Sequence, residues 1–131
     1  MSRITATLSV LSDRIRPDQI TSILSFTPDR FVLKGSDRNP PRSVPKAYGW
    51  YVTCKSEDDD TADGVLSSLL KRLGLVYSGI ASLLEDDPDI RVIFHVAIVP
   101  YSENVSLYFR SETINGVSKF GGILDIEFFD E

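Results

Sequence analysis

Two stretches of this chain, one at each end, follow the same order of strand, helix and strand. The first has an alternating apolar strand at residues 3–11, a short helix and a strand at residues 30–34. The second has an apolar strand at residues 90–99, a short helix and a final strand at residues 123–129. Such units build a sheet with helices packed against it. The pattern therefore constrains the architecture, but it specifies no reaction.

The middle of the chain adds one strand and two helices. Residues 48–55 alternate, with Trp50, Val52 and Cys54 on one side. An apolar stripe predicts a helix over residues 61–73 that starts from an Asp60 cap and ends at Gly74. A shorter helix is expected over residues 79–84, after a Ser78 cap, and Ser111 is expected to cap the short helix before the final strand.

The order of these elements predicts an α+β fold with a mixed, mostly antiparallel sheet and helices on one face. A ferredoxin-like arrangement and a duplicated pair of β-α-β units both fit, because the hydrophobic spacings of the two ends agree while few residues are identical. The 131 residues are expected to form a single domain over residues 1–131.

From its composition we expect the chain to be a cytoplasmic protein without a membrane-spanning helix. The apolar fraction is 42%, and no apolar run approaches the roughly 20 residues that a membrane helix needs. The start, Met1 to Arg3, enters a strand without a signal-peptide core. A single cysteine, Cys54, cannot form an internal disulfide, which fits a reducing compartment.

Charge is divided unevenly along the chain. Residues 1–56 hold nine Lys/Arg and four Asp/Glu, whereas residues 57–131 hold five and fifteen. An acidic chain is a poor candidate for nucleic-acid binding, which depends on cationic contacts to phosphate. If the fold keeps the two groups of charges apart, the surface could steer a charged partner or a second copy of the chain.

The sequence resembles a bacterial family known as domain of unknown function 4279. Four segments carry the resemblance, and they span nearly the whole chain: Arg16 to Ile20, Lys34-Gly35, Gly49-Trp50 with the helix Val65 to Leu73, and the final strand Gly122 to Phe129. The resemblance implies a small bacterial α+β domain. It implies no activity and no catalytic residues.

Few residues suit catalysis, and each has a structural explanation. His95, the only histidine, lies in the middle of an apolar strand, and Cys54 shares its alternation with buried apolar residues. A Cys54–His95 dyad would need the two strands to pair and the two side chains to meet. Asp125 and Glu127 share one strand face, which favours a solvated face over an acid–base pair in a cleft.

Metal and cofactor sites are not indicated either. The acidic run at residues 57–60 is contiguous and precedes a helix, unlike a calcium loop, which alternates its ligands. One cysteine and one histidine are too few for a conventional zinc site. No glycine-rich phosphate loop opens a helix. We therefore expect no catalytic residue, no metal and no cofactor.

The strongest candidate for binding is a basic, proline-rich loop over residues 35–46 and its flanks. Basic residues beside aromatic ones can bind a protein, a nucleic acid strand or a small anion. The candidate binding residues are Arg30, Lys34, Arg38, Arg42, Tyr48 and Trp50. A solvated loop with Trp50 in the core is the simpler structural explanation.

The sequence thus favours a non-enzymatic module that binds a protein, in an immunity-like or regulatory role, or that associates with itself as a homodimer. The alternative is a small-molecule or nucleotide-binding domain that uses the basic loop 34–46. An enzyme built on Cys54 and His95, or on Asp125 and Glu127, comes third.

Overall fold

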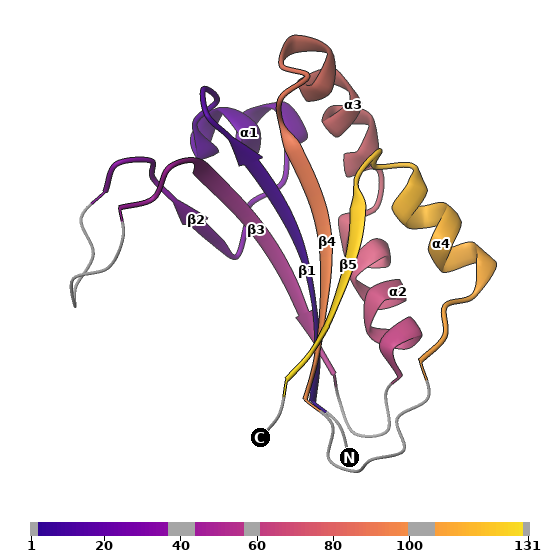
Figure 1. The fold of residues 1–131 in the computed structure, drawn as a ribbon. Helices are drawn as coiled ribbons and strands as arrows, with labels where there is room; N and C mark the ends of the chain where they lie inside the picture. The colour runs from indigo at the N-terminus through magenta and orange to yellow at the C-terminus, as the bar shows by residue number, and fades with distance from the viewer. Residues whose placement is uncertain (1–2, 37–43, 57–60, 100–106, 130–131) are drawn as a thin grey trace.

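A computed structural model describes residues 3–36, 44–56, 61–99 and 107–129. Within them the chain forms five strands and four helices (Figure 1). In chain order these are β1 (Arg3–Ser12), α1 (Pro17–Leu24), β2 (Arg30–Val32), β3 (Tyr48–Lys55), α2 (Ala62–Leu73), α3 (Val76–Asp86), β4 (Arg91–Val99), α4 (Ser111–Ser118) and β5 (Ile123–Phe128).

The five strands form one sheet in the order β2-β3-β1-β4-β5. The pairs β2–β3, β3–β1 and β1–β4 are antiparallel, and β4–β5 is parallel. The first four strands have the order of a ferredoxin-like β-α-β-β-α-β unit, and α4 with β5 extends it. The predicted mixed, mostly antiparallel sheet is confirmed.

The two strand-helix-strand ends are not equivalent copies. In the first, β3 lies between the parallel strands β1 and β2, whereas in the second β4 and β5 are direct neighbours. Similar hydrophobic spacing therefore arises from two different connections. The fold agrees with the ferredoxin-like expectation and does not show two matching units.

All four helices cover the same face of the sheet (Figure 1). Alternation explains this arrangement, because every second residue of β1 and β4 is buried while the residues between them are partly exposed. Helix α2 packs on β1 and β3, and α1 packs on β3 and α3. The largest fully buried side chains under the helices include Trp50, Phe94, Leu8, Ile20, Leu66 and Ile80.

Three details of the helices differ from the sequence-based expectation. Thr61 caps α2, because its Oγ1 accepts a hydrogen bond from Gly64 N at 3.0 Å, and the expected cap, Asp60, lies outside the described residues. Helix α3 begins at Val76 because Gly74, with a φ of 56°, ends α2 and the chain turns at once. Ser78 therefore lies inside α3. Helix α4 begins after Arg110, so Ser111 is its first residue and not its cap.

No helix in the described part of the chain is both long enough and apolar enough to cross a membrane.

Candidate functional site

A groove lies between α1 and the edge strand β2. Its volume is about 550 Å³, within the range of roughly 300–1,000 Å³ that is common for ligand sites. Phe31 on β2 is 59% exposed and Leu33 is 38% exposed. The lining residues are Arg16, Pro17, Asp18, Thr21, Thr27, Pro28, Phe31 and Leu33.

The α1 side of the groove is fixed by how the helix begins. Pro17 occupies the first helical position, where its missing N–H costs nothing. The backbone N–H of Arg16 donates to Gln19 Oε1 at 3.0 Å, so the turn before the helix is closed. The Arg16 side chain is 54% exposed and pairs with Asp18 at 3.5 Å. The rim of the groove thus presents the Arg16 guanidinium, whose positive charge is partly compensated by the Asp18 carboxylate.

The β2 side of the groove is fixed by Asp29. Its backbone N–H donates to Tyr51 O at 2.8 Å, and its Oδ2 accepts from Thr53 N at 2.8 Å. Both carboxylate oxygens accept hydrogen bonds of 2.6 Å from the Arg72 guanidinium of α2. These hydrogen bonds from Arg72 lower the pKa of Asp29 below its ordinary value, and the carboxylate raises the pKa of Arg72 in turn. Asp29 therefore ties the start of β2 to both β3 and α2.

Asp29→Asn is expected to lower the free energy of unfolding at pH 7 by about 1 kcal/mol, because the pair is partly exposed and screened. The depressed pKa of Asp29 makes its contribution complete above the unfolded pKa of about 3.9. That contribution is lost as the pH falls through the folded value. Urea unfolding should show the gap between wild type and Asp29→Asn closing as the pH falls from about 5 to about 2.

The exposed Glu85→Gln serves as the control for this measurement and should stay within about 0.5 kcal/mol of wild type. A gap for Asp29→Asn that stays constant over the whole pH range would contradict the role of the Asp29 charge.

The residues predicted to bind along the basic loop are spread over different surfaces. The Arg30 guanidinium stacks on the Tyr51 ring at 4.1 Å, on the sheet face without helices. Lys34 Nζ donates to Asp13 O at 3.1 Å, and Tyr48 lies under the Arg16 guanidinium at 5.8 Å. Arg38 and Arg42 fall outside the described residues. The described members therefore do not converge on one site.

Trp50 corrects the predicted site, because it has no exposed surface. Its ring lies on the helix-covered face of β3 and packs edge-on against Phe26 at 6.2 Å. Its Nε1 donates to Thr21 Oγ1 at 3.1 Å, which satisfies its one donor. Trp50 is a core residue and presents no ring to a ligand. Phe31 and Leu33 line the groove instead, and they have a sequence signal: a short run of apolar residues between Pro28 and Gly35.

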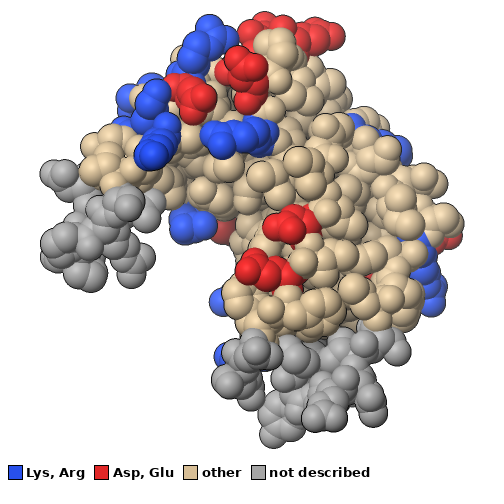
Figure 2. Space-filling model, in the orientation of Figure 1, with Lys and Arg blue, Asp and Glu red and all other residues tan. Residues whose placement is uncertain are grey.

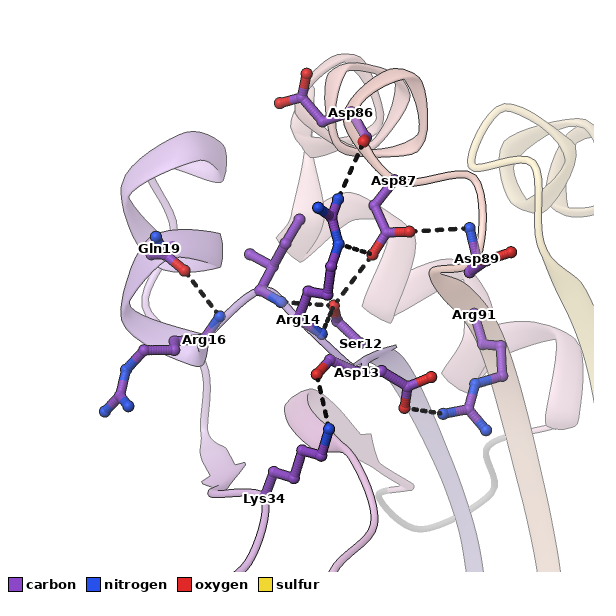
Figure 3. A network of polar contacts seen from close by, with 11 residues as sticks. Ser12, Asp13, Arg14, Arg16, Gln19, Lys34, Asp86, Asp87, Asp89 and Arg91 are labelled. Carbon is purple, nitrogen blue, oxygen red and sulfur yellow. Dashed lines mark hydrogen bonds and ion pairs between the residues drawn. The ribbon is translucent and has the colours of Figure 1, made fainter.

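At one end of the molecule the charges of the two halves of the chain are mixed. Figure 2 shows Lys/Arg and Asp/Glu side chains side by side at the upper end of the molecule, where Figure 1 places the ends of β1 and α3. There Arg14 reaches Asp87 at 3.7 Å and donates to Asp86 O at 3.2 Å, and Arg91 pairs with Asp13 at 3.8 Å (Figure 3). This end of the molecule is a structural network, so the sequence-level charge split does not produce two separate surfaces here.

Asp87 is the buried centre of that network. It is 5% exposed, and its Oδ2 lies 3.5 Å from the Ser12 hydroxyl that donates to it. Ser12 Oγ in turn accepts hydrogen bonds from the backbone N–H groups of Arg14 and Ile15 (Figure 3). The network joins the β1–α1 turn to the α3–β4 turn, and this explains the polar cluster without a ligand.

His95 lies between two carboxylates on the face of the sheet without helices. Its Nδ1 is 2.9 Å from Asp125 Oδ2, and its Nε2 is 3.4 Å from Glu127 Oε2. The parallel register of β4 and β5 places His95 opposite Asp125. The lone histidine and the carboxylate pair, which the sequence showed only as separate features, therefore lie together. The side chains are 29%, 57% and 51% exposed, respectively, so they lie on an open surface. Among the described residues, no group of three or more such side chains could hold a metal ion.

A Cys54–His95 dyad does not form. Cys54 is opposite Ala6 of β1, on the helix-covered face, whereas His95 is opposite Thr7, on the other face. The sheet therefore separates the Cys54 thiol from the His95 imidazole, so His95 is not placed to take the proton of the thiol.

Comparison with known proteins gives one match. The model of a family described as a domain of unknown function (DUF4279) matches residues 2–130. No curated protein and no solved structure matches the chain.

Proposed function

The chain belongs to the DUF4279 family, and we propose that this member is a non-enzymatic module that binds another protein in the groove between α1 and β2. The occupant is an extended segment of the partner with apolar side chains at alternate positions and at least one acidic residue. Binding of this kind would serve an immunity-like or regulatory role.

One observation carries the proposal: two large apolar side chains, one on an edge strand and one just after it, are exposed in a groove. Phe31 lies on β2 and Leu33 directly follows this strand, and both line the groove. Fully burying a side chain of this size contributes about 1.5–3 kcal/mol. Phe31 is 59% exposed and Leu33 38% exposed in the monomer, so a partner that covers them gains part of that contribution.

The position of β2 suits an extended occupant. The strand ends the sheet, so its outer edge pairs with no other described strand. Such an edge can accept a further strand through backbone hydrogen bonds, while pockets beside it select alternate side chains. The α1–β2 groove provides such a pocket next to the free edge.

Charge favours an acidic occupant. Arg16 lines the groove and Lys34 follows Leu33, whereas Arg30 stacks on Tyr51 on the other face of the sheet. Asp18 is the one carboxylate in the lining, so Arg16, Lys34 and Asp18 together carry one net positive charge. Complementary charge speeds association and selects among partners more than it adds affinity.

The alternative function, binding of a small molecule or nucleotide through residues 34–46, has less support. Trp50 is among the candidate binding residues beside this loop, and its ring is buried. The groove volume does fit a small ligand, so the experiment below includes that outcome.

Selection from a displayed library of random peptides tests the proposal directly. Panning on wild-type protein should enrich peptides that alternate apolar residues and contain an acid. A synthetic enriched peptide should lose at least about tenfold in affinity for Phe31→Ser, because the apolar contact is removed. Phe128→Ser is the matched control, since Phe128 is 53% exposed on the opposite edge strand β5.

Arg16→Glu separates the contribution of charge from that of apolar contact. It should weaken binding of the acidic peptide mainly at low salt, because exposed charges are screened as salt rises. Failure to enrich any peptide, or enriched peptides that bind Phe31→Ser as well as wild type, would contradict the proposal. Groove ligands found only among small anions would favour the alternative.

A further inference from the structure

We propose a second interaction surface, independent of the groove: the sheet face without helices is the interface of a homodimer. In this dimer the uncovered faces of two copies pack together, related by a two-fold axis parallel to β1.

The strand registers define this uncovered face. One row across the sheet contains Thr53, Thr7, His95 and Asp125, and the next contains Lys55, Thr5, Ala97 and Glu127. A third row contains Arg30, Tyr51, Ser9, Ile93 and Ile123. In these three rows the side chains on β1 are small, and larger ones stand on both sides; Arg3 and Leu11 lie on the same face of β1, beyond the three rows.

Charges are divided across this face. Arg30 and Lys55 lie on the β2–β3 side, and among the described residues neither has a carboxylate at ion-pair distance. Asp125 and Glu127 lie on the β5 side, where the two carboxylates contact the two ring nitrogens of His95. One edge of the face is therefore basic and the other is acidic.

A two-fold axis parallel to β1 makes such a face complementary to itself. The rotation places β5 of one copy over β2 of the other, and β4 over β3. Because this rotation keeps each row at its height, Lys55 of each copy then faces the row of Ala97 and Glu127 of the other, and Arg30 faces Ile123, one row from Asp125. A single rotation thus matches both charged edges at once, as an isologous interface requires.

The shape of the face also allows close packing. Thr5, Thr7 and Ser9 let the centres approach to the roughly 10 Å spacing of stacked sheets. The Tyr51 ring lies over Gly49, so it follows the sheet, with the Arg30 guanidinium on top of it. Ile123 is 63% exposed and would be covered in the dimer.

The area of the face suits a modest affinity. Five strands spaced about 4.8 Å apart, with an average of about seven residues at about 3.3 Å each, give on the order of 500 Å² per copy. The total is close to the lower limit of about 1,000 Å² for a specific interface. A reversible, salt-sensitive dimer is therefore expected.

Sedimentation of the wild-type chain over a range of concentrations is the first test. The dissociation constant should rise at least about tenfold between about 0.05 M and about 0.5 M salt, because the charged edges are screened. A chain that remains monomeric at about 0.5 mM protein and low salt would overturn the proposal.

Charge exchange between variants is the decisive test. Asp125→Lys with Glu127→Lys makes the whole face basic, and Arg30→Glu with Lys55→Glu makes it acidic. Each variant alone should lose at least about tenfold in self-association, since like charges then meet at both edges. A mixture of the two should restore dimers, because the heterodimer is complementary at both edges.

Glu85→Lys with Glu112→Lys changes the net charge by the same amount in the helix layer and should leave the dimer intact. Variants that still dimerise alone, or a mixture that stays monomeric, would overturn the proposal. Circular dichroism of each variant identifies misfolding, and in that case Glu127→Gln and Lys55→Gln replace the charge reversals. Phe31→Ser should not alter the dimer. A failure of the dimer proposal is therefore distinguishable from a failure of the proposed binding in the α1–β2 groove.

Discussion

Trp50→Ala is expected to lower the free energy of unfolding by about 3–5 kcal/mol. Trp50 has no exposed surface, and its ring fills the space between β3 and α1 beside Phe26. Truncation leaves a cavity and removes the donor of the hydrogen bond to Thr21. A residue that stacked on a ligand at the surface would show a much smaller effect on stability.

Urea unfolding followed by circular dichroism measures this effect. Trp50→Phe should cost about 1–2 kcal/mol, because an aromatic ring remains and the hydrogen bond is lost. A loss below about 1 kcal/mol for Trp50→Ala would contradict the core role of Trp50.

Phe120→Ala is expected to cost a similar amount, about 3–5 kcal/mol. Phe120 follows α4 and is 3% exposed, and its ring packs edge-on against Phe94 at 5.0 Å and Tyr77 at 6.1 Å. These contacts join the α4–β5 extension to the ferredoxin-like part. The loss should therefore appear in one cooperative unfolding transition.

Ile114→Ala on the same helix is the control, since Ile114 is 52% exposed and should change stability by no more than about 0.5 kcal/mol. A first transition in Phe120→Ala that removes only part of the helical signal would show that the extension unfolds on its own. That result would contradict a single cooperative domain.

Much of the fold could be predicted from apolar spacing alone. The strand 48–55 and the last strand coincide with β3 and β5 within one residue, because alternation and flanking glycines or prolines define both. The start of α3 was missed because Leu75 and Val76 carry no cap residue. Helix α3 begins there only because Gly74 redirects the chain toward α1, where Gly79 allows close contact with Leu24.

The candidate site was less predictable, because it depends on which face each residue takes and which strands are neighbours. The sequence places Trp50 beside basic residues but does not show that α1 covers it. Likewise, His95 and Asp125 meet only through the β4–β5 register. Phe31 and Leu33 could have been singled out as apolar residues in a short strand, but their exposure depends on β2 lying at the edge.

Hydrogen exchange with and without a library-selected peptide tests the central claim, that a partner segment occupies the α1–β2 groove, most directly. The account predicts that the peptide slows amide exchange in β2 and in α1, and that the slowing disappears in Phe31→Ser. Protection confined to β5 or to the uncovered face of the sheet, with β2 and α1 unchanged, would contradict it.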